Sequence, residues 1–442
     1  MRAATLADSE ALAAFNADHL RSQDAGEPQA SLAEWTRDLV AGARPGTSAS
    51  DATIIEDGAG AIVSAMFLIS HTWSYGGVRI AVGQPELVGT RPEFRGRGLV
   101  RTLFELVHAR SAARGDLMQV ITGIPWFYRQ FGYEFGIGRG GGGRLFPSEL
   151  ASRPADGGMR VRAARVEDAG FFAELDASAA GRHVVHVPRD AAQWRYEMTG
   201  HRAGSATAHV FGVIEDASTA RPLGAFVHAP KLWSAGTLGL TMLEVVPGVS
   251  WRAVVLTALD HLRAAGEALA VRDGKPFGGV SFWFLGREHP AYDAIRVRYD
   301  AADTWYAVYT RVPDVAAFLR AAAPVLERRL AASRLAGHTG DLKLSTYRDG
   351  ARLVLEDGRV KTVERWQPSF TLVGQENGIA TTDPRRPDAQ FPDLTILQLL
   401  FGLRSLDDLT AWYPDCVVRT PATRALVNAL FPRQPSFVWP IL

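Results

Sequence analysis

Residues 86–100 read ELVGTRPEFRGRGLV, a stretch that changes from apolar strand to glycine-containing turn to helix. The apolar start predicts a strand, and the turn residues that follow exclude bulky side chains. A helix is predicted from Leu99 onward, because apolar residues recur at helical spacing. These residues are Leu99, Leu103, Leu106 and Val107. Gly115 follows as a candidate C-cap, so the stretch predicts a strand, a loop and a helix in sequence.

The loop between this strand and this helix suits an anion. Gly96 and Gly98 allow backbone N–H groups to approach a ligand without interference from a Cβ atom. These groups lie at the helix N-terminus, where the helix dipole favours negative charge such as phosphate. Arg95 and Arg97 add positive charge. A glycine turn with two solvated arginines is the alternative interpretation of the loop taken alone.

Two segments together resemble the GNAT superfamily of N-acyltransferases. The Arg-x-x-Gly loop after an apolar strand is similar to the family's acyl-CoA pyrophosphate loop. Residues 125–133, PWFYRQFGY, resemble the segment in which those enzymes carry a catalytic tyrosine. The resemblance implies acetyl-CoA as acyl donor and a set of cofactor contacts on the strand, loop and helix. This set is Leu87, Val88, Gly89, Thr90, Arg95, Gly96, Arg97, Gly98, Leu99, Val100 and Arg101.

The chain also contains an internal repeat, which predicts a duplicated domain. The matching segments are residues 2–8 and 162–168, 55–57 and 214–216, and 86–88 and 244–246. The second copy lacks Arg-x-x-Gly after its strand; Pro247 removes a backbone donor there, and Trp251 adds bulk. We therefore expect the second copy to keep the fold and to have lost the cofactor site.

Three domains are predicted: a catalytic GNAT domain at 1–150, a degenerate GNAT domain at 158–312, and an α+β domain with a tail at 313–442. Residues 140–143 and 147–158 are the expected linker. The three domains together resemble N-acetyltransferases of the enhanced intracellular survival (Eis) type, and residues 399–405 resemble their sterol-carrier-protein-like third domain. The predicted fold class is α/β and α+β: two tandem GNAT-fold domains, each a mixed sheet with helices, followed by a sterol-carrier-like domain.

Amine acetylation requires a polarised thioester carbonyl, a base for the ammonium and an acid for the departing thiolate. Tyr128 matches the family's proton-donor tyrosine; the alternative is an aromatic residue that only packs. Tyr133 is a weaker rival. The base has two candidates, Glu86 on the strand and the terminal carboxylate of Leu442, the latter being the Eis-type solution. Glu244 shows that a strand glutamate also occurs in the copy without a cofactor loop.

The tail, residues 431–442 with the sequence FPRQPSFVWPIL, is too apolar to remain in water, so we expect it to be buried. It either packs inside the third domain or threads into the cleft of the first domain, where its carboxylate would lie near Tyr128. Asp24, Glu27 and Trp35 fall in the region that shapes the acceptor cleft in this superfamily. Acidic and aromatic groups suit a cation, although solvated surface explains them equally well.

The resemblance implies a primary amine as acceptor, on a small cationic molecule similar to an aminoglycoside or polyamine, or on lysine. The alternative function is a non-catalytic acyl-CoA- or lipid-binding carrier with a vestigial site. The resemblance also implies a homo-oligomer, possibly a hexamer.

Composition and charge argue against several other classes of function. A net charge of +1 gives no electrostatic basis for nucleic-acid binding. The chain has no apolar run of the ~18 residues that a membrane span needs, and its start lacks a signal-peptide pattern. The single Cys416 excludes an internal disulfide, so we expect a soluble protein of the cytoplasm. The histidines lack the spacing of a metal site, so no metal is expected.

Overall fold

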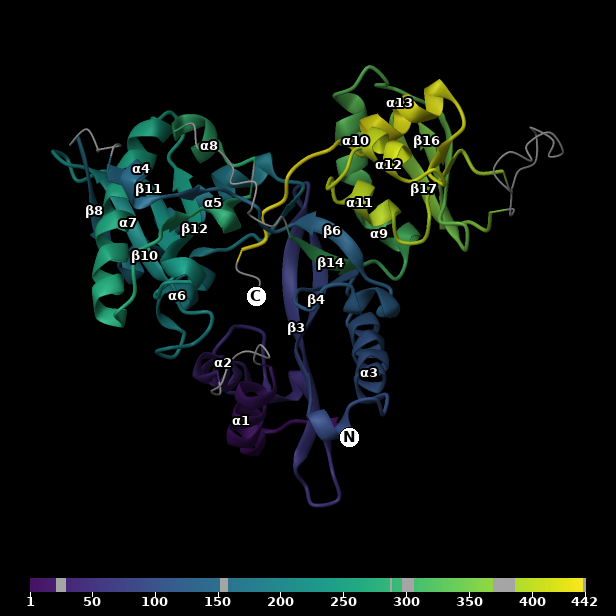
Figure 1. Cartoon of the computed structure of the whole chain (residues 1–442). Helices are drawn as coiled ribbons and strands as arrows, with labels where there is room; N and C mark the ends of the chain where they lie inside the picture. The colour runs from purple at the N-terminus through teal and green to yellow at the C-terminus, as the bar shows by residue number, and fades with distance from the viewer. Residues whose placement is uncertain (21–28, 152–157, 287, 296–305, 369–385, 440–442) are drawn as a thin grey trace.

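The computed structural model describes residues 1–20, 29–151, 158–286, 288–295, 306–368 and 386–439. Three sheets, each flanked by helices, form three units (Figure 1). None of the helices in these ranges combines the length and the hydropathy needed to cross a bilayer.

The first unit is built on a sheet with the strand order β1-β2-β3-β4-β5-β14-β6, and β9 pairs with β3. Helices α1 and α2 lie on one side of the long strands β3 and β4, and α3 lies on the other (Figure 1). Apolar side chains fill the layer on each side of the sheet. The bounds are β1 Arg2–Ala3, α1 Ser9–His19, α2 Ala30–Val40, β2 Ala52–Glu56, β3 Ile62–Tyr75, β4 Val78–Thr90, α3 Leu99–Ala113, β5 Met118–Ile121, β6 Glu134–Gly138, β9 Val185–His186 and β14 Ala307–Arg311.

The second unit has a sheet with the order β7-β13-β12-β11-β10-β8. Its long helix α7 packs against β8, β12 and β13. The bounds are β7 Arg144–Leu145, α4 Pro147–Ala151, β8 Met159–Ala163, α5 Ala169–Ala179, α6 Ala191–Thr199, β10 Val210–Asp216, β11 Pro222–His228, β12 Thr237–Val245, α7 Trp251–Asp273, β13 Gly279–Ser281 and α8 Pro290–Ile295.

The third unit has the strand order β17-β16-β15-β18-β19. β15 and β16 form a hairpin and pair antiparallel up to Ser345 and Gly350. Only β15 and β18 run parallel among the described pairs of this sheet. The bounds are α9 Val315–Ala321, α10 Ala323–Ala331, β15 Gly340–Ser345, β16 Gly350–Glu356, β17 Arg359–Arg365, β18 Ala389–Gln390, α11 Ile396–Leu400, α12 Leu406–Trp412, β19 Val417–Val418 and α13 Pro421–Leu430. The predicted class of mixed sheets with helices is therefore confirmed.

The first two units share a set of ion pairs that joins the start of each repeat to its second strand. Arg2 pairs with Asp8 and with Glu56, both at 2.7 Å. In the second unit Arg162 pairs with Asp168 at 2.7 Å and with Glu215 at 2.9 Å. The same three side chains recur at matching positions, as a duplicated domain requires.

The sheets do not follow the expected domain ranges at three strands. β9 and β14, both inside 158–312, belong to the first sheet, where β9 pairs with β3 and β14 lies between β5 and β6. β7, inside 1–150, pairs with β13 in the second sheet. The second range thus gives two strands to the first sheet and receives one strand from the first range. The glycines at 140–143, expected as a linker, are instead packed: a Cβ at Gly142 would lie 1.9 Å from the Tyr292 hydroxyl. The chain needs glycine there because two units meet at its backbone.

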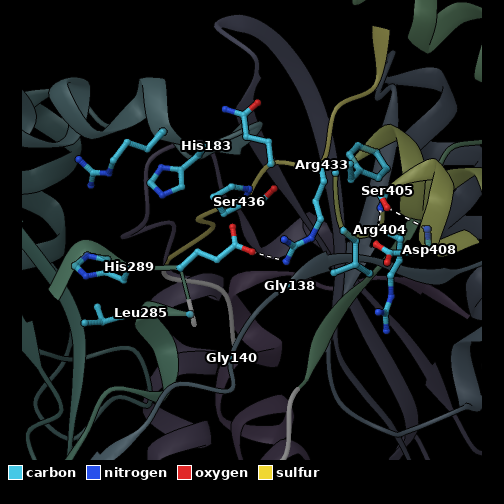
Figure 2. A pocket seen from close by; sticks show the side chains of 18 of the residues that line it. Gly138, Gly140, His183, Leu285, His289, Arg404, Ser405, Asp408, Arg433 and Ser436 are labelled. Atoms are coloured by element: carbon cyan, nitrogen blue, oxygen red, sulfur yellow. Dashed lines mark hydrogen bonds and ion pairs between the residues drawn. The ribbon is translucent and has the colours of Figure 1, made fainter. Parts of the chain in front are cut away.

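The tail leaves the third unit and runs back between the other two (Figure 1). The Val184 amide donates to the Pro435 carbonyl at 2.8 Å, and the Phe437 amide donates to Val185 at 2.9 Å. Figure 2 shows the cavity of about 660 Å³ that the tail crosses, with Arg433 paired to Glu288 of the second unit. The described tail therefore does not pack as a strand inside the third unit, because its partners are strand β9 and the second unit.

Candidate active site

A bulge in β4 opens the first sheet next to the glycine loop. Glu86 pairs with Phe67 and Gly89 with Ala65, so Leu87 and Val88 face a single partner residue. Leu87 accordingly has a φ of +51°, a left-handed conformation rare for such a residue. β4 and β5 pair in parallel only at residues 82–83 with 118–119. Beyond that point the two strands are no longer paired, so the edge of β4 past Leu87 has no strand partner on that side.

The loop after β4 keeps the conformation that its glycines predicted. Gly96 and Gly98 have φ values of +74° and +78°, and a Cβ on either would meet no atom within 4 Å. Helix α3 begins directly after Gly98, so its first four N–H groups have no intrahelical acceptor. Arg95 and Arg97 are exposed beside it. Open space, unpaired amides and positive charge fit a pyrophosphate.

The second unit closes the equivalent opening. Pairing of β11 with β12 is regular from Gly224–Val245 to Val227–Met242, without a bulge near Glu244. The His289 Nε2 atom lies 3.1 Å from the Leu243 carbonyl oxygen of β12, and Trp251 packs against His289 with ring centroids 5.4 Å apart. The slot in the second unit is thus filled by its own side chains.

Glu244, which corresponds to Glu86 in the second unit, is held in an ion pair. Arg182 donates to both carboxylate oxygens of Glu244, at 2.6 and 2.7 Å, and stacks over Trp251. Tyr292, the loose counterpart of Tyr128, donates to the Phe282 carbonyl at 3.2 Å and receives the Gly143 amide at 3.1 Å. The groups that match the candidate acid and base are therefore engaged in packing and pairing.

Tyr128 lies in the same apolar cluster as the bulged strand and α3. It is 4% exposed, and Val88 and Val100 pack against the cluster that contains it. Burial, together with the nearby Glu86 carboxylate, raises the pKa of the Tyr128 phenol. Its hydroxyl therefore keeps its proton at neutral pH and is available as a general acid.

Tyr133, the rival, is committed elsewhere. It is fully buried, and its hydroxyl lies 3.0 Å from the His108 Nε2 atom. Burial lowers the pKa of His108 to about 4, so this imidazole is neutral and the pair is a buried hydrogen bond. Tyr128 is the tyrosine that remains next to the bulge.

Glu86 is the last acceptor in a chain of hydrogen bonds. Which atom donates and which accepts at each step follows from the chemistry of the side chains. Arg44 can only donate, so the His71 Nδ1 atom at 2.9 Å accepts and His71 carries its proton on Nε2. That proton is donated to Gln84 Oε1 at 2.7 Å, which leaves the Gln84 amide nitrogen to donate to Glu86 at 2.7 Å. Burial raises the pKa of Glu86 to about 7, and the Gln84 donor opposes this shift.

The tail is anchored by its tryptophan. Trp439 is 5% exposed, stacks on Trp194 with centroids 5.7 Å apart, and lies under the Arg189 guanidinium. Trp439 and Arg139 line one small cavity, and the positive charge of Arg139 lowers the pKa of Glu86. Arg139 is thus a neighbour that the tail shares with the candidate base.

The other sequence-predicted residues fall in three places. Leu87–Thr90 and Arg95–Arg101 line the bulge, the loop and the start of α3 as expected. Trp35 is 6% exposed and packs in the core under α1 and α2, so it does not reach a cleft. Asp24, Glu27 and Leu442 lie outside the described residues.

Several site residues were missed from the sequence. Gln84 and His71 are polar residues of strands, with nothing in the local pattern to separate them from surface residues. Tyr306 and Tyr309 hold the loop before Tyr128: they contact the Gly123 carbonyl at 2.5 Å and the Trp126 amide at 2.6 Å. An alternation of apolar residues at 306–310 could have indicated the strand, but not its place in the first sheet.

Comparison with known proteins agrees with this geometry. Residues 3–136 match the family described as the acetyltransferase (GNAT) domain. The chain is an acetyltransferase. No curated protein matches the sequence.

Solved structures share the fold of this chain over nearly its whole length. A GCN5-related N-acetyltransferase from Kribbella flavida is 18% identical with a TM-score of 0.61, covering 99% of this chain and 96% of its own. One from Anabaena variabilis is 12% identical, with a TM-score of 0.61 and coverages of 99% and 98%. Eis1 from Mycobacterium abscessus is 15% identical, with a TM-score of 0.56 and coverages of 98% and 97%. At these identities the likeness shows the fold alone.

Replacing Tyr128 by Phe should lower turnover by about 10²-fold, the low end for loss of a general acid, and should leave acetyl-CoA affinity nearly unchanged. Steady-state kinetics and calorimetry measure the two effects. Tyr133→Phe is the matched control, because it removes a buried hydroxyl that bonds to His108 and should reduce stability rather than turnover. Native turnover in Tyr128→Phe would show that the proton comes from another group.

Replacing Gln84 by Leu should move the acidic limb of the pH–turnover profile upward. The active form of Glu86 is ionised, so turnover rises with pH through its pKa near 7. Without the Gln84 donor the ionised form loses a stabilising bond, its pKa rises, and the limb moves to higher pH. Glu86→Gln should remove the limb. A limb that stays in place in both variants would contradict a role for Glu86 as base.

Proposed function

We propose that the protein is an acetyl-CoA-dependent N-acetyltransferase that acts on a primary amine in its first unit. The observation that carries the proposal is the contrast between the two repeats. The bulged strand, glycine loop and Tyr128 come together in the first unit, whereas His289, Trp251 and Arg182 fill the matching place in the second.

The bound cofactor would supply an acetyl group activated as a thioester. The N–H groups at 96–101 and the Arg95 and Arg97 side chains would hold its phosphates. The unpaired amides past Leu87 would hold its extended arm and polarise its carbonyl. The described residues contain no cluster of His, Cys, Asp and Glu fit to hold a metal ion.

Two groups of the chain can take the amine proton. Glu86, with a pKa near 7, can accept it directly or through water. The terminal carboxylate is the other candidate, because Trp439 anchors the tail and the three residues after it can span at most ~10 Å. Tyr128 then protonates the leaving sulfur.

Thiol release from acetyl-CoA over a panel of primary amines tests the proposal, with the N-acetylated product identified by mass spectrometry. We expect amine-dependent release and a product heavier by one acetyl group. Stabilisation by acetyl-CoA without turnover of any amine would instead favour the non-catalytic carrier. Assembly as a homo-oligomer and a sterol-carrier-like third domain remain predictions from the sequence.

A further inference from the structure

A cleft of about 1190 Å³ lies between the first two units, and the tail residue Trp439 is part of its lining. Its walls include the start of α2 at Ala30, strand β7 at Arg144 and the segment 229–237 of the second unit. Trp439 and Phe284 also line the small cavity that holds Arg139. The cleft therefore adjoins the cavity of Arg139, the arginine whose positive charge acts on Glu86.

One wall of the cleft is aromatic. Trp233 packs edge-on against Phe284 with centroids 5.2 Å apart, and Phe284 contacts Trp283 at 4.8 Å. Trp439 closes the end of this wall. Such flat, rigid surfaces favour an aromatic or other apolar body over a heavily hydrated one.

The charged side chains of the described lining are positive. Arg144 pairs through its backbone with Ser281 of β13, and its side chain stacks on Phe146 at 4.1 Å. Its Nε atom is buried without a hydrogen-bond partner, and its guanidinium has no ion pair within the described ranges. Lys231 is exposed at the other side of the cleft.

No group among the described lining residues balances these charges. None of them is Asp or Glu. His209 is neutral as well, because burial lowers its pKa to about 4. A polycation would therefore meet like charge here, whereas an anionic group would find a desolvated arginine donor.

We infer that the acceptor is an amine that also carries an aromatic or apolar body and a carboxylate, as an aromatic amino acid does. This inference rests on the proposed N-acetyltransferase function. Arg144 would bind the carboxylate, the aromatic wall would hold the body, and the amine would lie toward Glu86. In the reaction an N–C bond forms and the thioester C–S bond breaks. The ammonium first gives one proton to the base; after the amine attacks, the nitrogen loses its second proton, which restores the Tyr128 hydroxyl that has protonated the leaving thiolate.

Matched amines test this inference directly: phenylalanine against phenethylamine, and tryptophan against tryptamine. With the wild-type protein we expect kcat/KM to be at least about 10-fold higher for the amine that carries the carboxylate, through KM, as one charge-assisted pair predicts. Arg144→Gln should remove this preference by lowering kcat/KM for the amines that carry the carboxylate at least about 10-fold. Arg272→Gln, at the distal end of α7, is the matched control and should keep the preference.

Three results would contradict the inference, and each is distinguishable from the others. Equal or faster turnover of phenethylamine, tryptamine or a polyamine such as spermidine would reject the acceptor class but keep the N-acetyltransferase. The absence of turnover with every amine, despite acetyl-CoA binding, would reject the proposed function and the inference with it. A preference for the carboxylate that survives Arg144→Gln would reject the assignment to Arg144.

Discussion

Gly98→Val should abolish detectable binding of acetyl-CoA. The substitution places a β-branched side chain in the open space beside the α3 amides, where the pyrophosphate would lie, at a φ of +78°. The side chain excludes the phosphate, and the strained backbone turns the amides away from it. Isothermal calorimetry measures the affinity, and thermal melts with and without acetyl-CoA measure the stabilisation by ligand.

Gly248→Val in the second unit provides a control with the same backbone problem. Gly248 has a φ of +84° and equally open surroundings. Both variants should therefore lose about 1–3 kcal/mol of stability from backbone strain. Only Gly98→Val should lose the ligand. Equal weakening of acetyl-CoA binding in both variants would contradict the assignment of the cofactor to the first unit.

Moving the end of the chain should lower turnover by about 10² to 10⁴-fold if the terminal carboxylate is the base. One added glycine displaces that carboxylate by about 3.5 Å, and deletion of Ile441 and Leu442 withdraws it. The anchor at Trp439 is untouched, so both variants should fold. Single-turnover rates at saturating acetyl-CoA measure the effect without interference from acceptor affinity.

Leu442→Ala is the matched control for the tail, because it removes the side chain and keeps the carboxylate at the same chain position. It should retain most of the activity. If the extended or shortened chain folds and acetylates at the native rate, the terminal carboxylate is not the base. Glu86 then becomes the first candidate, and Glu86→Gln should show the loss instead.

The local parts of the site could be predicted because short-range rules control them. Apolar spacing from Leu99 to Val107 and the glycines of the loop indicated α3 and its N-terminus, and the structure has both. The repeat was equally visible, since Arg2, Asp8 and Glu56 recur with the same order. For α3 the deciding residues lie within one element and its loop, and for the repeat they lie in two stretches of similar sequence.

What could not be predicted depends on contacts between distant segments. Tyr309 holds the Trp126 amide from 183 residues away, and periodicity carries no information about which sheet a strand joins. The bulge at Leu87 arises from pairing with β3 and has no glycine to indicate it. Trp35, predicted to lie in the acceptor region, is instead a core residue, as Trp194 of the second unit is.

The second unit shows how a repeated fold can be kept while its cofactor site is lost. His289 and Trp251 pack together next to β12. His289 Nε2 lies within hydrogen-bond distance of the Leu243 carbonyl oxygen, so the strand no longer presents this polar group to a ligand. Arg182 compensates Glu244, whose pKa burial raises to about 7. The second unit thereby becomes a scaffold for the tail and for one wall of the cleft.

The number of acetyl-CoA molecules bound per chain tests the central claim, that one of two related units holds the cofactor. Native mass spectrometry of the intact protein, titrated with acetyl-CoA, measures it directly. We predict one molecule per chain for the wild-type protein and for Gly248→Val, and none for Gly98→Val. Two molecules per wild-type chain, or one that persists in Gly98→Val, would contradict the account.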